Sequence, residues 1–207
     1  MNSLSLRVII VSFAFFSCGK AGDGSSVTAP DVETIGTAIV SRRGDSVILD
    51  GFTESPRGEY VVPDEITEIG KRAFYDSDVT GITFPSSLER IGEFAFAHCG
   101  SLVEITLPDS LTELEPYAFA DCTGLRQMTA GSGLALIGEY AFISCINLRQ
   151  FTLSSTTPPR LLEFEEYGTM GVFAFVHEDM SITVPAGTSA TYKAADGWSA
   201  YAGRIRE

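Results

Sequence analysis

The dipeptide Ala-Phe recurs along this chain at nearly constant spacing, and this repeat limits the possible folds more than any other feature. Each step between neighbouring copies is 22, 23 or 23 residues, and the copies are Ala73-Phe74, Ala95-Phe96, Ala118-Phe119 and Ala141-Phe142. We expect a degenerate fifth copy at Ala174-Phe175, after an insertion of about ten residues relative to the regular step. A period of this size is typical of solenoids, in which each unit buries its apolar side chains only against its neighbours.

Apolar residues keep one register around each Ala-Phe pair. Downstream, each unit ends in a segment of the form LxxIxL, such as Leu102-Val-Glu-Ile105-Thr-Leu107. The last residues of such a segment point inward with period two, as in a β-strand. Upstream, a second extended segment such as Leu88-Glu-Arg-Ile91 leads through a glycine into the Ala-Phe corner. Parallel stacking of these units predicts columns of equivalent residues about 4.8 Å apart.

Residues 85–107, PSSLERIGEFAFAHCGSLVEITL, carry the motif P-x-x-L-x-x-I-G-x-x-A-F-x-x-C-x-x-L-x-x-I-x-L. This motif resembles the BspA-like leucine-rich-repeat family, over roughly residues 60–207. The resemblance implies a leucine-rich-repeat solenoid, mainly β with short turns and helical corners. It also implies a bacterial surface protein, since members of the family include adhesins that contact host extracellular proteins and other cells. Two departures from the motif are Glu115 in place of a glycine and Gly131 in place of a proline.

The ends of the repeat array carry different signals. Thr37–Leu49 predicts two short strands around Arg43-Gly44-Asp45, which we interpret as a turn and not as an integrin-binding tripeptide. Near the other end, Ser189–Ala195 predicts a short helix that stops at Gly197, with Trp198, Tyr201 and Ile205 closing the last coil. The organisation we expect is a signal peptide at 1–17, a lipid-anchored flexible tether at 18–30, an N-terminal cap at 31–62, four leucine-rich repeats at 63–153, and an insertion loop, degenerate repeat and C-terminal cap at 154–207.

The N-terminal segment indicates export. Arg7 precedes an apolar run from Val8 to Phe16, which is too short to span a bilayer and is typical of a signal peptide. Cys18 follows this run directly and resembles the lipidated cysteine of bacterial lipoproteins. We expect lipidation of Cys18 and anchoring at the outer membrane or cell surface of a Gram-negative bacterium. The alternative is an ordinary secretory signal, with Cys18 incidental.

Composition limits the chemistry. The formal net charge is −13, which disfavours binding to nucleic acid, and the chain has only two histidines and one tryptophan. Cys99, Cys122 and Cys145 lie 23 residues apart, which is the repeat spacing, so we interpret them as a column of buried free thiols. We therefore expect neither an enzyme nor a cofactor or metal, and give a cysteine-dependent enzyme using Cys99 little weight.

The outward positions of the LxxIxL strands form the candidate binding face. Three ladders of mostly polar side chains run along it, and Arg126 and Arg149 would stack as like charges in adjacent coils, which is unfavourable unless an anionic group lies near them. The alternative is a merely solvated sheet face, because threonine is a common exposed strand residue. The candidate ligand-binding residues are Glu104, Thr106, Arg126, Gln127, Thr129, Arg149, Gln150 and Thr152.

Two functions remain open at this point. The first is a non-enzymatic, surface-tethered repeat protein that binds an extracellular protein or a cell-surface glycoprotein. The second is an accessory envelope lipoprotein, which binds glycan near the aromatic residues Tyr192, Trp198 and Tyr201 or acts as a subunit of an envelope complex. The stretch Thr156–Gly171, with the acidic residues Glu163, Glu165 and Glu166, is expected to project as a loop.

Overall fold

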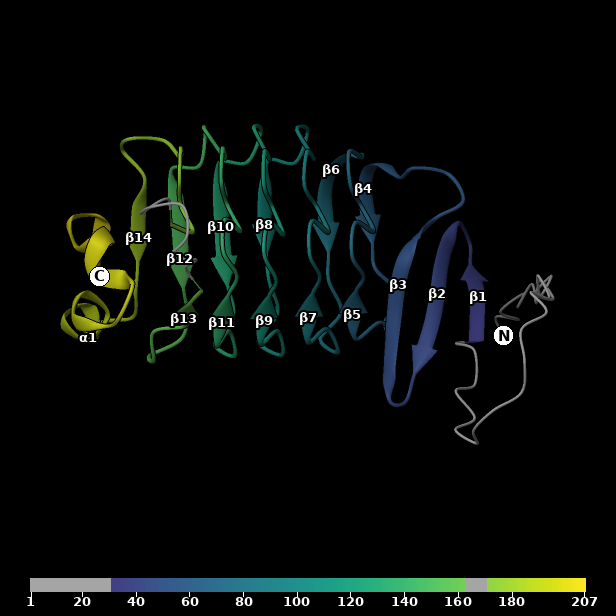
Figure 1. The fold of residues 1–207 in the computed structure, drawn as a ribbon, viewed down its shortest axis with the longest axis horizontal. Coiled ribbons are helices and arrows are strands. Elements are labelled where there is room, and N and C mark those ends of the chain that lie inside the picture. The colour runs from purple at the N-terminus through teal and green to yellow at the C-terminus, as the bar shows by residue number, and fades with distance from the viewer. Residues whose placement is uncertain (1–30, 163–170) are drawn as a thin grey trace, which may run out of the picture.

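The computed structural model describes residues 31–162 and 171–207 of the chain. These residues form a β-solenoid of about seven turns with little helix. Figure 1 shows the strands stacked side by side along the long axis, with an antiparallel hairpin at the N-terminal end and short helices at the C-terminal end. The predicted leucine-rich-repeat solenoid is confirmed.

A first sheet of eight strands runs along one side of the solenoid. Its first three strands are antiparallel, and every later strand pairs parallel to the one before it. In spatial order the strands are β1 (Asp31–Ile35), β2 (Ala38–Arg43), β3 (Ser46–Phe52), β5 (Glu68–Ile69), β7 (Arg90–Ile91), β9 (Glu113–Leu114), β11 (Leu136–Ile137) and β13 (Arg160–Leu161). The predicted turn at Arg43-Gly44-Asp45 connects β2 to β3, and Gly44 has φ +60°.

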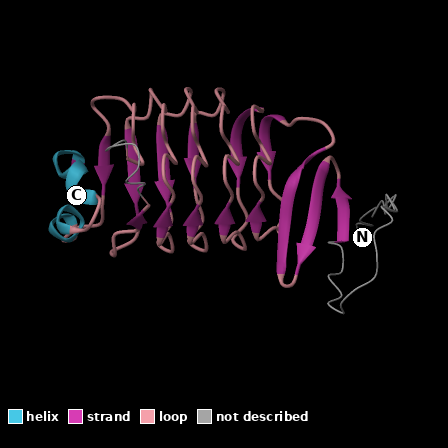
Figure 2. Cartoon of the chain, viewed as in Figure 1, coloured by secondary structure: helices cyan, strands magenta, loops and turns pink. Residues whose placement is uncertain are grey.

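A second, five-stranded parallel sheet lies on another side, and three of its strands come from the LxxIxL segments. Its strands are β8 (Glu104–Thr106), β10 (Gln127–Ala130), β12 (Gln150–Leu153), β14 (Ser181–Thr183) and β15 (Ile205–Arg206). Figure 2 shows the two rows of strands with loops between them.

The second sheet does not continue to the N-terminal end of the solenoid. Strands β4 (Arg57–Val61) and β6 (Asp78–Thr83) pair with each other in parallel, but β6 is not hydrogen-bonded to β8. The unit that contains β6 is the one whose Ala-Phe step is 22 residues, so it is one residue shorter than the next. On this side, the backbone ladder is therefore interrupted between the first and second units.

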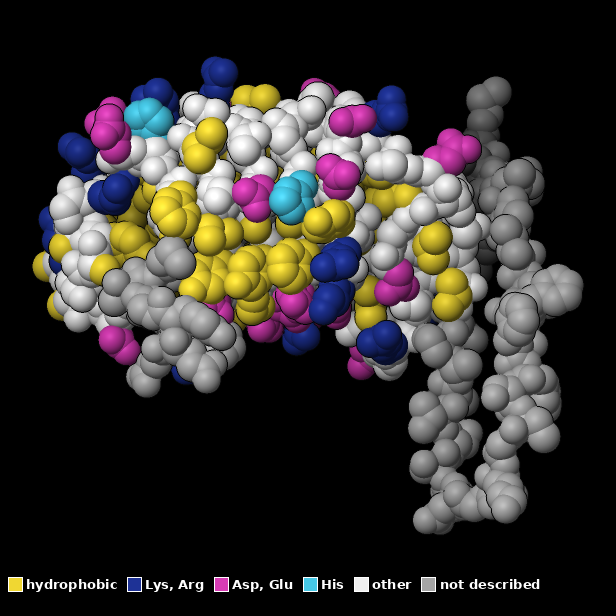
Figure 3. Space-filling view, turned by 45° about the horizontal axis from the view of Figure 1, so that its top comes forward, with side chains coloured by type: hydrophobic (Ala, Val, Ile, Leu, Met, Phe, Trp, Pro, Cys, Tyr) yellow, Lys and Arg dark blue, Asp and Glu magenta, His cyan; other side chains and the backbone are white. Residues whose placement is uncertain are grey.

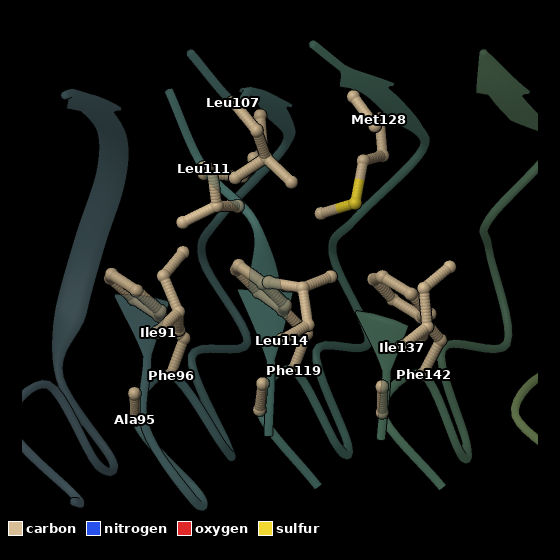
Figure 4. Packing of buried hydrophobic residues seen from close by; sticks show 14 of the residues in the cluster. Ile91, Ala95, Phe96, Leu107, Leu111, Leu114, Phe119, Met128, Ile137 and Phe142 are labelled. Carbon is tan, nitrogen blue, oxygen red and sulfur yellow. The ribbon is translucent and has the colours of Figure 1, made fainter. Parts of the chain in front are cut away.

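The core is a set of columns, one for each motif position (Figure 4). Phe74, Phe96, Phe119 and Phe142 are fully or almost fully buried, and their rings stack on one another at centroid separations of 4.6, 5.1 and 5.7 Å. The backbone of each corner is joined to the next, since the amide of Phe96 donates to the carbonyl of Ala118 and that of Phe119 donates to that of Ala141. Apolar burial and repeated hydrogen bonds together fix the register of the coils.

The fifth copy differs from the prediction at Ala174-Phe175. The amide of Phe142 donates to the carbonyl of Val172, the ring of Phe173 stacks on that of Phe142 at 5.5 Å, and Phe175 is 64% exposed. Residues two positions after each core phenylalanine have positive φ, and Phe175 (φ 55°) follows Phe173 at that distance. Val172-Phe173 therefore occupies the Ala-Phe position of the motif. The prediction of Ala174-Phe175 for this position was wrong by two residues.

The predicted insertion loop is also partly wrong. Within Thr156–Gly171, strand β13 pairs with β11 and continues the first sheet. The C-terminal cap holds this segment, because Tyr192 Oη donates to the carbonyl of Ser155 at 2.7 Å and Trp198 Nε1 donates to that of Pro159 at 2.6 Å. The acidic residues Glu163, Glu165 and Glu166 lie outside the described residues.

The C-terminal cap has the predicted form. Helix α1 (Ser189–Ala194) ends before Gly197, which has φ +73°, and the 3₁₀ helix η2 (Trp198–Arg204) follows. Trp198 and Ile205 are buried against the last coil. At the opposite end, β3 and β4 already pair in parallel with the repeat strands, although they lie in the stretch 31–62 that was expected to form a cap.

Candidate functional site

The second sheet places the predicted candidate residues in straight ladders. Glu104, Gln127 and Gln150 are register partners, and so are Thr106, Thr129 and Thr152. Strand β14 extends both ladders by one step, to Ser181 and Thr183. The hydrophobic residues between them, such as Ile105, Met128 and Phe151, point into the core and are buried. The alternation of outward polar and inward apolar residues is what a strand with one solvated face requires.

The polar side chains of this face are open to solvent. Glu104, Thr106, Gln127 and Gln150 are exposed, whereas Thr129 and Thr152 are half-buried between neighbouring strands. Arg126 and Arg149 are exposed in adjacent coils, and the amide of Arg149 donates to the carbonyl of Arg126 at 2.9 Å. All eight predicted residues therefore lie on one continuous surface of β8, β10 and β12, which we call the strand face.

Arg126 and Arg149 form no ion pair, as is also true of several other cations of the described chain, such as Arg43 and Arg160. Elsewhere, ion pairs join Arg42 to Glu33, Arg57 to Asp78, Lys71 to Glu93, and Arg90 to both Glu113 and Glu115. In the described part of the chain, no ion pair or side-chain hydrogen bond involves the guanidinium of Arg126 or Arg149. The two arginines therefore lie in adjacent coils, as predicted, and neither forms an ion pair within the described residues.

A shallow hollow of about 600 Å³ lies at the C-terminal part of the strand face. Arg126, Gln127, Arg149 and Gln150 line it, and Asn147, Asp179 and Ser181 complete its wall. The sequence did not indicate the last three residues, because Asp179 and Ser181 follow the insertion and their register depends on the fifth coil. Every lining side chain is polar, so the hollow offers hydrogen-bond donors and acceptors and no apolar floor.

A second hollow, of about 440 Å³, lies where the second sheet is interrupted. Glu59 and Glu104 lie beside it, Gly81 leaves its centre without a side chain, and Ile82 and Phe84 supply an apolar floor. Two features of the sequence indicate this hollow: the first unit is one residue shorter, and Gly81 stands at the ladder position that Glu104 holds in the next unit.

The cysteine column has the predicted structural role. Cys99, Cys122 and Cys145 are free and fully buried, and each Sγ donates to a phenylalanine carbonyl of the preceding coil, at 3.1 Å in all three cases. Burial raises the pKa of the Cys99 thiol despite a contact with Ser77, and raises that of Cys122 well above its usual range. Thiols in this state are poor nucleophiles.

The aromatic residues of the C-terminal cap do not form the expected glycan platform. Trp198 and Tyr192 are 0% exposed, and their rings pack against each other with centroids 5.3 Å apart. Tyr201 is half-buried and packs edge-on against Phe173. With Trp198 and Tyr192 wholly buried, stacking of a sugar ring on this cluster, as proposed from the sequence, is not supported.

Figure 3 shows hydrophobic side chains gathered in a band along the long axis on one face of the molecule. A second aromatic column, which the sequence analysis missed, consists of Phe94, Tyr117 and Tyr140 just before each Ala-Phe pair. Their centroids are 4.6 and 5.1 Å apart, and the Arg72 guanidinium lies over the Phe94 ring at 5.3 Å. Phe94 and Tyr117 stack face to face and Tyr140 is tilted against Tyr117, and such ring and cation contacts stabilise the corner.

Several remaining predictions concern residues outside the strand face. Cys18, with the expected signal peptide and tether, lies outside the described residues. His98 is exposed at a corner, with its Nε2 4.0 Å from Asp121 Oδ2. Among residues 31–162 and 171–207, no helix is long and apolar enough to cross a membrane, and no three metal-ligating side chains come together.

Comparison with known proteins gives a consistent result. Residues 50–159, more than half of the chain, match the family of the BspA type leucine rich repeat region in six copies. A comparison with curated proteins found no match.

Solved structures with a similar fold come from several bacteria. A leucine-rich repeat protein of T. pallidum is 22% identical, with a TM-score of 0.57 over 73% of this chain and 70% of that one. The pneumococcal vaccine antigen PcpA is 16% identical, with a TM-score of 0.52 over 84% of this chain and 45% of that one. A protein of Faecalibacterium prausnitzii described as a leucine rich cell surface protein is 14% identical, with a TM-score of 0.49 over 81% and 54%.

Proposed function

Because the chain belongs to the family of BspA-type leucine-rich-repeat proteins, we propose that it is an exported, surface-tethered binding protein that uses its strand face to hold an extracellular protein or a cell-surface glycoprotein. The observation that carries the proposal is the row of mostly exposed polar side chains on β8, β10 and β12, with, at its C-terminal part, two arginines without an ion-pair partner among the described residues. Solenoids in general present their partners with an extended face of this kind.

The rest of the described surface is less suited to this role. On the first sheet, Arg90 is already paired with Glu113 and Glu115, and Arg42 with Glu33. The rings of the second aromatic column, Phe94, Tyr117 and Tyr140, already contact one another. The strand face is different, because its amides and guanidinium groups have unused hydrogen-bonding capacity that a partner can satisfy.

Export and tethering belong to the same proposal. The apolar run from Val8 to Phe16, with Cys18 just after it, supports a signal peptide followed by a lipidated cysteine. Fatty-acid labelling of cells that express the wild-type chain or Cys18→Ala tests this part: we expect label only in the wild type. Equal labelling of the two chains would contradict lipid anchoring and leave an ordinary secretory signal.

Binding itself is tested by biolayer interferometry with the full-length chain, purified in detergent, against immobilised matrix glycoproteins and bacterial glycans. We expect saturable binding to at least one of them. Replacement of Arg126, Gln127, Arg149 and Gln150 by alanine should weaken it by about tenfold or more, because central, desolvated side chains carry most of the energy of an interface.

The matched control is Arg43→Ala/Arg160→Ala, which removes two exposed arginines from the first sheet and keeps the strand face intact. This variant should bind as the wild type does. Circular dichroism of all variants checks the fold. Undiminished binding by the folded variant with four alanines would place the interface elsewhere. If the wild-type chain bound none of the immobilised glycoproteins and glycans, an accessory role in the envelope would be favoured.

A further inference from the structure

The two arginines of the strand face lie side by side at one hollow. Their coils are adjacent, so the two side chains begin about 4.8 Å apart. Like charges directly opposite each other on neighbouring strands are destabilising, and this chain, with 27 acidic residues, has many carboxylates that could have been placed beside them. The described ion pairs instead involve other cations.

The groups around the arginines supply both donors and acceptors. The Asn147 amide nitrogen donates to the carbonyl of Thr123 at 2.7 Å, which leaves the amide oxygen of Asn147 as an acceptor. Gln127 and Gln150 are exposed register partners with no hydrogen bond to other described side chains. Amides of this kind recognise hydroxyl groups, because each amide can donate to one oxygen and accept from another.

The one acidic group of the hollow also limits the ligand. Asp179 is exposed, and its carboxylate lies 3.9 Å from His177 Nδ1. A carboxylate at the wall repels a ligand that is anionic over its whole length, but it accepts hydrogen bonds from hydroxyl groups. The hollow therefore fits a ligand with one anionic group beside several hydroxyls.

From these contacts we infer that the hollow binds an acidic saccharide, with its carboxylate or sulfate on Arg126 and Arg149 and its hydroxyl groups on Gln127, Asn147, Gln150 and Asp179. This inference rests on the proposed function and names the ligand chemistry of the same face. A volume of about 600 Å³ is in the usual range for small-ligand sites. The lack of apolar lining distinguishes the site from a peptide groove, which needs hydrophobic anchors.

Isothermal titration calorimetry with the full-length chain tests the inference with four probes. Sialyllactose carries one carboxylate beside several hydroxyls, lactose 3′-sulfate carries one sulfate, lactose carries neither, and a short polyglutamate peptide carries carboxylates without sugar. We expect at least one acidic saccharide to bind and the neutral one not to bind. Comparison of the first two probes shows whether carboxylate or sulfate is preferred.

The decisive variant is Arg126→Gln/Arg149→Gln, and its matched control is Arg43→Gln/Arg160→Gln, which lowers the formal net charge by the same two units. We expect the first to weaken acidic-saccharide binding by about tenfold or more for each guanidinium, since hydrogen bonds to charged groups contribute about 1.5–3 kcal/mol. The control should change it by less than about twofold. Binding should also weaken as salt is raised.

The outcomes separate this inference from the proposed function. No binding of either acidic saccharide, or equal loss in both double variants, would overturn the inference, whereas the interferometry panel would still decide whether the strand face binds a partner. Polyglutamate binding as tight as that of the saccharides would overturn the assignment to sugar. Saccharide binding that the Arg126/Arg149 variant alone loses would support it.

Discussion

The ring of Phe173 is the last member of the buried phenylalanine column and connects the coils to the C-terminal cap. It stacks on Phe142, meets Phe151 at 5.0 Å and is covered by Tyr201 at 5.2 Å. Phe175, two residues later, points into solvent from a left-handed corner. The same side chain therefore has opposite surroundings at two nearly adjacent positions.

Replacement of each phenylalanine by alanine measures this difference. Phe173→Ala should lower the free energy of unfolding by about 3–5 kcal/mol, because it removes a buried ring and leaves a cavity. Phe175→Ala should change it by less than about 0.5 kcal/mol. Urea denaturation followed by circular dichroism gives both values. Equal effects, or a larger effect at Phe175, would contradict the register of the fifth coil.

The dipeptide alone could not reveal this register. Ala174-Phe175 reproduces the motif letters, whereas Val172-Phe173 does not, yet valine and phenylalanine fill the buried positions as well as the motif pair does. Burial depends on the distance from the cap and on the length of the insertion. Neither can be obtained from the regular step, so the four regular copies were predictable and the fifth was not.

At the scale of the elements, the coils approach each other so closely that several glycines have no room for a side chain. A Cβ on Gly131 would lie 2.4 Å from the carbonyl oxygen of Pro108 in the preceding coil. Gly131 stands where the motif has a proline, and because it has no side chain it lets the backbones of the two coils approach closely. Gly203, in η2, has no atom within 4 Å of the equivalent point.

These two glycines give a matched pair of substitutions. Gly131→Ala should destabilise the fold by about 1–3 kcal/mol, because the backbone of Pro108 cannot move aside without disturbing the stacked coils. Gly203→Ala should be neutral or slightly stabilising, since alanine is favoured over glycine in a helical segment. Thermal unfolding of the two variants compares them. A neutral Gly131→Ala would mean that the coils are spaced more widely than described.

The outward residues of the strand face could be predicted from the pattern of a single element, whereas the residues that complete the hollow beside it could not. Alternation in LxxIxL is sufficient to place Arg126, Gln127, Arg149 and Gln150 outward. In contrast, Asp179 reaches the same hollow only because β14 pairs with β12 across the insertion. Pairing between segments separated by an irregular insertion depends on tertiary packing, which a local pattern does not contain.

At the scale of the whole molecule, the solenoid is closed at its C-terminal end by a cap whose polar atoms are satisfied internally. Tyr192 is fully buried, its hydroxyl donates to the carbonyl of Ser155, and burial raises its pKa to about 12. The neutral hydroxyl is therefore the form that the folded state holds. An unfolded tyrosine loses its proton near pH 10.

This difference predicts an alkaline loss of stability. Below about pH 10 both states keep the proton, and the contribution of Tyr192 is fully present. As pH rises from about 10 to 12, the unfolded state ionises first, so the free energy of unfolding falls. Urea midpoints at pH 8 and pH 11 measure the fall. Burial also raises the pKa values of Tyr60, Tyr117 and Tyr140, so the free energy of unfolding should fall somewhat even without Tyr192.

Tyr192→Phe isolates the contribution of the cap. The variant should be about 1 kcal/mol less stable at pH 8, because the hydrogen bond to Ser155 is lost, and its decline between pH 8 and pH 11 should be smaller than that of the wild type. An identical decline in both chains would show that Tyr192 ionises normally in the folded state.

The interruption of the second sheet between β6 and β8 has a mechanical consequence. At this level the two parts of the solenoid are joined by backbone hydrogen bonds through the first sheet, where β5 pairs with β7, and through the Ala-Phe corners, but not through the second sheet. The solenoid can therefore open on the side of the second sheet at this level without breaking hydrogen bonds between strands. The same opening anywhere between β8 and β14 would break them. Changes in curvature along the axis, and with them any adjustment of the strand face to a partner, should therefore concentrate at this level.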